Sequence, residues 1–153
     1  MLRQAAAAGT TDIVASPHAN TEYAFDPLVV ERMIGQLQAA VGDVPRIHYG
    51  CDFHLTLDNI EDALRSPGKY SIDPRGYLLV EFSNFLIPKT TDQVFAQMMQ
   101  VGLRPIVTHP ERNQLLQRRL PQHFDGFLQT LGPIVQPGQD VAVDIDHGGT
   151  RRG

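Results

Sequence analysis

Side chains that can bind a metal ion follow short apolar segments at several points of this chain. The segments lie at residues 13–15, 46–50, 77–80 and 104–108, and the side chains that follow them are His18, Asp52, His54, Glu81 and His109. Imidazole nitrogens and carboxylate oxygens bind divalent metal ions. The carboxyl ends of parallel strands meet at one edge of an α/β sheet or barrel. The pattern therefore predicts a metal site at such an edge.

Two of these side chains stand out because of their neighbours. His109 precedes Pro110, whose ring restricts the residue before it to extended conformations, so the imidazole is expected to point outward from the strand end. Glu81 follows four apolar residues, and a carboxylate at the mouth of a buried strand is costly unless it is paired or bound to metal. A salt bridge at the strand end is the alternative for Glu81.

The segment around Phe53 contributes two candidates to one face. Asp52 and His54 flank Phe53, so an extended strand places both on the same side and turns Cys51 to the other side as a small core residue. His48 is in phase with them but lies deeper in the strand. We expect His48 to be a hydrogen-bonded structural histidine.

Arg112 adds a cation close to His109 in the sequence. Its planar guanidinium matches the geometry of phosphate oxygens, and a surface cation at a helix start is the alternative. Two further histidines are less informative: His123 is expected on the surface, and His147 falls among the glycines and arginines of the last residues.

The elements that must position these residues alternate along the chain. Strands are expected at residues 12–15, 46–55, 77–82 and 104–108. Helices are expected at residues 2–8, 27–41, 58–64 (capped by Asp58), 91–101, 113–120 and 123–131. The strand at 77–82 is continuously apolar, as a strand covered on both faces would be. Strands that alternate with helices predict parallel βα units and an α/β fold.

Composition limits the classes of protein that need to be considered. The chain has 153 residues, a hydrophobic fraction of 42% and a formal net charge of −4, which suits one globular domain. No basic block suggests nucleic-acid binding, and no apolar run approaches the length of a membrane span. The single Cys51 excludes an internal disulfide and fits a cytoplasmic location.

The order of the motifs resembles a known family. Ser16-Pro17-His18, Gly50-Cys51-Asp52, the segment from Tyr77 to Phe82 and the segment from Pro105 to Arg112 are similar to the polymerase-and-histidinol-phosphatase (PHP) domain. Within it they most resemble the bacterial capsular-polysaccharide type of manganese-dependent protein-tyrosine phosphatase. The resemblance implies a distorted β/α barrel, of which this chain would form a part, with metal ions at the carboxyl ends of its strands.

The resemblance also implies roles for particular residues. His18, Glu81 and His109 fall on metal-ligand positions, and Asp52 falls where the family usually carries a bridging glutamate. Arg112 falls on the arginine that grips the phosphate. The implied activity is hydrolysis of phosphotyrosine with Mn²⁺ or Fe, on a tyrosine kinase that controls capsular or exopolysaccharide assembly.

The ends of the chain depart from the family pattern. The family's His-x-His strand and Asp-rich loop would precede Met1, and the likeness fades after Gln136. We therefore expect a partial PHP-type domain at residues 1–136 and a divergent, disordered tail at residues 137–153. An inactive fragment and a small-molecule phosphatase of the histidinol-phosphatase type remain as alternatives, and a homo-oligomer is left open.

Overall fold

The computed structural model describes residues 1–72 and 76–117. Its helices are α1 (Leu2–Ala7), α2 (Pro27–Val41), α3 (Leu57–Arg65), the short 3₁₀ helix η1 (Pro67–Lys69) and α4 (Thr91–Gln100). Its strands are β1 (Asp12–Ala15), β2 (His18–Ala19), β3 (Arg46–Tyr49), β4 (Asp52–His54), β5 (Tyr77–Glu81) and β6 (Arg104–Val107). None of the helices in these residues is long and apolar enough to cross a bilayer. The helix expected at 123–131 and the tail expected at 137–153 lie outside the described residues.

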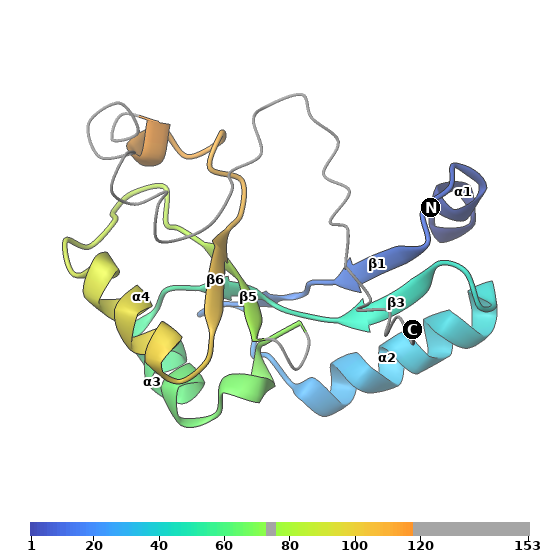
Figure 1. The fold of residues 1–153 in the computed structure, drawn as a ribbon, viewed down its shortest axis with the longest axis horizontal. Coiled ribbons are helices and arrows are strands. Elements are labelled where there is room, and N and C mark those ends of the chain that lie inside the picture. The colour runs from blue at the N-terminus through green and yellow to red at the C-terminus, as the bar shows by residue number, and fades with distance from the viewer. Residues whose placement is uncertain (73–75, 118–153) are drawn as a thin grey trace, which may run out of the picture.

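Every strand pairing in the described residues is parallel. β1 pairs with β3 in a two-stranded sheet, and the order β2-β4-β5-β6 forms a four-stranded sheet. Figure 1 shows β1 and β3 beside α2, and β5 and β6 beside α3 and α4. The predicted α/β class with parallel βα units is confirmed. The described strands stay open, as in part of a barrel.

The strand predicted at 46–55 is wrong as a single element. The structure divides it into β3 and β4, which belong to different sheets and are separated by Gly50 and Cys51. A Cβ atom at Gly50 would lie 2.5 Å from Cγ1 of Val14, so only glycine allows this close approach where the chain passes from one sheet to the other. The prediction also missed the two-residue strand β2, which pairs with β4.

The core lies between the four-stranded sheet and the two helices α3 and α4 (Figure 1). Among its largest fully buried side chains are Phe53, Leu78, Val80, Phe95, Met98 and Leu103. The other face of β5 carries Tyr77, Leu79 and Glu81, which are only half-buried. The expectation that β5 is covered on both faces is therefore wrong for the described residues, because α3 and α4 pack on one face alone.

Local signals explain the helix ends. Asp26 accepts hydrogen bonds from the backbone N–H groups of Leu28 and Val29, and Pro27 occupies the first turn, so α2 has the predicted limits. The predicted cap of α3 at Asp58 is wrong, because the hydroxyl of Thr56 accepts from the backbone N–H of Asn59 at 3.2 Å. The helix predicted from 113 begins at Gln114 and is described as far as Gln117.

Candidate metal centre

Three of the predicted ligand residues meet at the ends of neighbouring strands. Nδ1 of His18 lies 3.3 Å from Oδ2 of Asp52 and 3.5 Å from Oε2 of Glu81. One donor atom from each of these residues lies within 4.8 Å of the others. We call these residues the three-residue cluster. Asp52 is buried, Glu81 is half-buried and His18 is exposed, so the cluster opens to solvent on one side.

The register of the parallel strands creates the cluster. His18 is the partner of Asp52 between β2 and β4, and His54 is the partner of Glu81 between β4 and β5. Partnered residues of parallel strands point to the same face, and residues one position along point to the opposite face. Phe53 and Val80 are fully buried in the core beneath α3 and α4. The polar residues beside them therefore turn to the uncovered face.

His54, a candidate from the sequence to which the family resemblance gave no ligand role, belongs to the same site. Its Nε2 lies 2.7 Å from Oε2 of Glu81, the carboxylate oxygen that also faces His18. The position of His54 on the same strand face as Asp52 was the signal in the sequence. A hydrogen bond of this kind fixes the orientation of the Glu81 carboxylate. The alternative is that the His54 imidazole itself binds the metal as a further ligand.

Thr108 supports the cluster from β6. Its hydroxyl lies 3.4 Å from Oδ1 of Asp52 and donates to the carbonyl oxygen of Val80 at 3.2 Å. Its backbone N–H donates to the same carbonyl at 2.9 Å. The end of β6 is therefore attached to the end of β5 next to Glu81. The sequence shows no signal for this role of Thr108.

The electrostatics of the cluster favour a cation. Burial raises the pKa of Asp52, and the charge of Glu81 raises it further, while His18 opposes the shift. Two carboxylates near one another at a partly buried place resist joint ionisation unless positive charge compensates them. One imidazole nitrogen and two carboxylate oxygens at this spacing form a donor set that fits a divalent metal such as Mn²⁺.

His109 lies on the turn that follows β6, outside the three-residue cluster. The expectation of an extended His109 before Pro110 is wrong: its φ angle is +48°, in the left-handed region. The backbone N–H of Arg112 donates to the carbonyl of His109 at 2.9 Å, and this tight turn overrides the extended preference. Nδ1 of His109 lies 3.7 Å from Oε1 of Glu111. It directly follows Thr108, whose hydroxyl lies 3.4 Å from Oδ1 of Asp52, so it lies at the same edge as the cluster.

Arg112 lies on the same turn and faces solvent. Its side chain is 76% exposed, and its Nε lies 3.6 Å from Oε1 of Glu111. The guanidinium thus has one carboxylate contact among the described residues. Most of this guanidinium is therefore open to solvent.

Two other predictions from the same segments are confirmed. His48 is hydrogen-bonded, with Nε2 at 2.7 Å from Oδ1 of Asp12, in the two-stranded sheet. Arg46 contacts the same oxygen at 3.2 Å, and the hydrogen bond from His48 is the main reason why the pKa of Asp12 is lowered. Cys51 is fully buried in the core.

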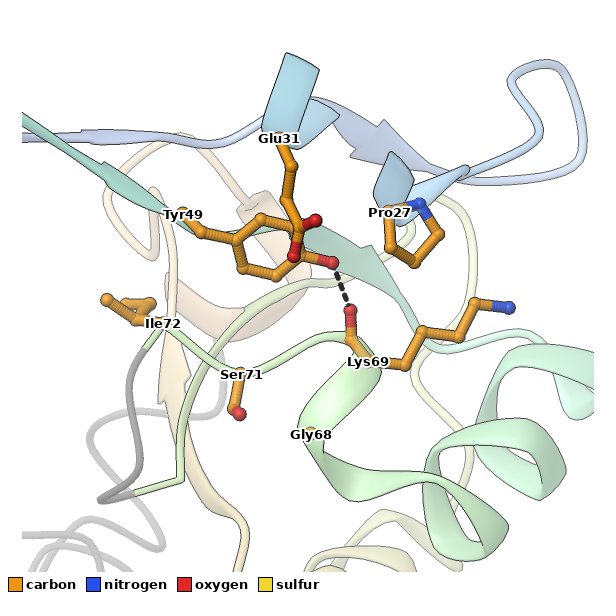
Figure 2. A pocket seen from close by; sticks show the side chains of 7 residues that line it. All are labelled: Pro27, Glu31, Tyr49, Gly68, Lys69, Ser71 and Ile72. Carbon is orange, nitrogen blue, oxygen red and sulfur yellow. Dashed lines mark hydrogen bonds between the residues drawn. The ribbon is translucent and has the colours of Figure 1, made fainter. Parts of the chain in front are cut away.

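An open hollow of about 350 Å³ lies elsewhere in the structure (Figure 2). Its lining residues are Pro27, Glu31, Tyr49, Gly68, Lys69, Ser71 and Ile72, none of which belongs to the three-residue cluster. The ammonium of Lys69 is already bound by Asp62 at 2.7 Å. We therefore assign the chemistry to the strand ends and not to this hollow.

The fold and the cluster together define a parallel α/β domain with a candidate metal centre formed by residues of the neighbouring strands β2, β4 and β5. Comparison with protein families is consistent with this class. The chain belongs to the capsular polysaccharide synthesis family CpsB/CapC, whose family model matches residues 1–136.

Individual relatives point in the same direction. CapC of Staphylococcus aureus is 30% identical over 130 residues, which make up 82% of this chain and 50% of that protein. The tyrosine-protein phosphatase YwqE of Bacillus subtilis is 29% identical over 118 residues, 74% of this chain and 46% of YwqE. A solved structure from the work on YwqE and on CpsB of Streptococcus pneumoniae, described as metal-dependent tyrosine phosphatases, matches with a TM-score of 0.67 at 27% identity. That match covers 77% of this chain and 49% of the other. The chain thus spans about half the length of these relatives.

Proposed function

We propose that this protein hydrolyses phosphotyrosine in proteins with the help of a divalent metal, which we take to be Mn²⁺. The observation that carries the proposal is the convergence of His18, Asp52 and Glu81 within 4.8 Å at the strand ends. The likeness to YwqE and CpsB, which are described as metal-dependent tyrosine phosphatases, supports the same activity. We propose His109 as a further ligand, because it lies at the same edge.

Each residue of the site would have its own role in phosphomonoester hydrolysis. A divalent metal bound at the cluster supplies Lewis acidity, which lowers the pKa of a water molecule and compensates phosphate charge. His18, Asp52 and Glu81 would hold the ion, and His54 would keep the Glu81 carboxylate in place through its 2.7 Å hydrogen bond. The exposed guanidinium of Arg112 would bind non-bridging phosphate oxygens.

The family suggests a biological substrate. We propose a phosphorylated tyrosine kinase of capsular or exopolysaccharide assembly as the partner, acted on in the cytoplasm. Membership of the capsular polysaccharide synthesis family supports this choice.

The test is turnover by the purified chain with added Mn²⁺. A phosphotyrosyl peptide should be hydrolysed faster than histidinol phosphate, and the chelator EDTA should abolish the reaction. Glu81→Gln and Arg112→Lys should each lower kcat/KM by at least about tenfold, because the first removes a ligand charge and the second a planar phosphate contact.

Matched controls are available on exposed helix surfaces. Glu61→Gln and Arg32→Lys make the same chemical changes at exposed positions of α3 and α2 and should leave kcat/KM unchanged. Activity that survives EDTA, or that falls equally in the controls, would refute the proposed site. If histidinol phosphate is hydrolysed faster than the peptide, the substrate is a small molecule and not a protein.

A further inference from the structure

Asn59, in the first turn of α3, makes an unusual pair of contacts with two strand ends. Its side-chain Nδ2 donates to the carbonyl oxygen of Ala19 at 2.8 Å and to that of His54 at 3.0 Å. Both hydrogens of the amide are therefore used. The Thr56 hydroxyl that caps α3 binds the backbone N–H of the same residue at 3.2 Å. Asn59 thereby connects the start of α3 to the ends of β2 and β4.

The contact with Ala19 matters because β2 has only two residues. On one side of His18, the carbonyl of Pro17 accepts from the backbone N–H of Asp52 at 3.0 Å. On the other side, the carbonyl of Ala19 accepts from Asn59 at 2.8 Å. The backbone of His18 is thus held between these two hydrogen bonds, and so short a strand has few ladder bonds of its own to hold it.

The contact with His54 connects Asn59 to Glu81, another residue of the three-residue cluster. The carbonyl of His54 accepts from Asn59, and the imidazole of His54 is hydrogen-bonded to Glu81. The side-chain amide of Asn59 therefore binds two backbone carbonyls. One belongs to Ala19, next to His18, and the other belongs to His54, whose imidazole orients Glu81.

We propose that Asn59 is a positioning residue of the metal centre, which sets the separation between His18 and the Asp52–His54 strand end before the metal binds. The inference rests on the proposed function, because it concerns the affinity of the same cluster for metal. Fixing ligands in advance removes an ordering cost from binding, and partners behind the ligands commonly contribute a factor of about 10–100 to metal affinity.

The experiment compares Mn²⁺ binding by the purified chain and its Asn59→Ala variant in calorimetric titrations. We expect the Kd for Mn²⁺ to rise about 10–100-fold in the variant. A second readout needs no metal: amide hydrogen exchange at Ala19 and the imidazole resonances of His18 should report a loosened β2 end in the EDTA-treated variant.

Gln38 provides a control for a purely structural effect. Its side-chain amide also donates to two backbone carbonyls, those of Gly42 and Pro45, and its Oε1 accepts from the backbone N–H of Ile47, but it joins α2 to β3 away from the cluster. Gln38→Ala should lower the thermal midpoint and leave the Mn²⁺ affinity unchanged. Should Asn59→Ala fail to fold, Asn59→Ser, which retains one hydroxyl donor, takes its place with an intermediate loss of affinity expected.

The outcomes separate the two proposals. A wild-type protein that binds no Mn²⁺ overturns the proposed function and this inference with it. A wild-type protein that binds Mn²⁺, beside an Asn59 variant of equal affinity, overturns the inference alone. Equal losses of affinity in the Asn59 and Gln38 variants would also overturn it, because stability would then explain the effect.

Discussion

Oε2 of Glu81 faces two imidazoles at once, with Nε2 of His54 at 2.7 Å and Nδ1 of His18 at 3.5 Å. His54 is also the register partner of Glu81 between β4 and β5. One carboxylate oxygen therefore links the histidines of two strands. Removal of its charge should affect metal binding and metal-free stability in different directions.

Glu81→Gln keeps the size of the side chain and removes the charge. We expect the Kd for Mn²⁺ to rise by at least about 100-fold. This effect is larger than that of a residue that positions a ligand without binding the metal itself. The free energy of unfolding in EDTA should be equal or higher, because the charge that raises the pKa of Asp52 is gone. Calorimetry and urea unfolding measure the two quantities. A large loss of metal-free stability would contradict this account of the cluster.

Asn113 performs two tasks that can be separated by mutation. Its Nδ2 donates to the carbonyls of Phe82 and Ser83, and its Oδ1 accepts from the backbone N–H groups of Leu115 and Leu116. Asn113→Ala loses both sets, at a cost of about 2–3 kcal/mol in the free energy of unfolding.

Asn113→Asp keeps the helix cap and loses only the amide donors. Its cost in urea unfolding should therefore be smaller than that of the alanine variant. The prediction fails if the two variants are equally destabilised.

Gly50→Ala should destabilise the bend between the two sheets. The new Cβ would lie 2.5 Å from Cγ1 of Val14 and 3.2 Å from the carbonyl oxygen of Ala15. Overpacking of this kind costs about 1–3 kcal/mol. Gly68→Ala is the control, because nothing lies within 4 Å of its added Cβ, and its midpoint of urea unfolding should be close to wild type. Equal midpoints for both variants would show that the bend tolerates a side chain.

Asp62 should contribute to stability in a pH-dependent manner. Hydrogen bonds from Lys69 and then Tyr70 lower the pKa of Asp62 below its ordinary value of 3.8. Because the folded-state pKa is lowered, the contribution is present above pH 3.8 and is lost as the pH falls through the folded-state value.

The thermal midpoints of wild type and Asp62→Asn should accordingly differ at neutral pH and converge in acid. The exposed Glu61→Gln on the same helix serves as the reference for a lost surface charge. A difference that persists unchanged in acid would show that the ionised carboxylate is not responsible.

Cys51 should be chemically inert in the folded protein. Burial raises the pKa of its thiol to about 12, so at pH 8 only roughly one molecule in ten thousand carries the reactive thiolate. Mass spectrometry after treatment with iodoacetamide should detect little modification without urea and complete modification with it. Rapid labelling of the native protein would mean that β4 opens readily at its start.

The sequence predicts the parts of this fold that depend on neighbouring residues. The limits of α2 follow from Asp26, Pro27 and Gly42, which act within one turn of the helix. The break at Gly50 depends instead on Val14, distant in sequence, and a two-residue strand such as β2 has no periodicity to detect. Tertiary contacts therefore account for both errors.

The candidate site shows the same difference between features that depend on neighbouring residues and features that depend on tertiary contacts. The order of polar residues after apolar segments predicts that His18, Asp52 and Glu81 converge, because parallel strands share one edge. His54 required the cross-strand register, which pairs it with Glu81. The conformation of His109 depends on the turn closed by Arg112, and this turn outweighs the restriction imposed by Pro110. The ligand roles of His18, Asp52, Glu81 and His109 stay predictions, and so does the role of Arg112.

The register that pairs His18 with Asp52 and His54 with Glu81 also constrains how this family can diverge. A substitution in β4 changes one side chain, whereas an insertion or deletion of a single residue there would turn Phe53 outward and the polar residues into the core. Changes in length should consequently accumulate in the loops at residues 20–26 and 82–90, while the strands beside them keep a constant number of residues. Gaps in an alignment of relatives should therefore fall in these loops and spare the segments that carry the site.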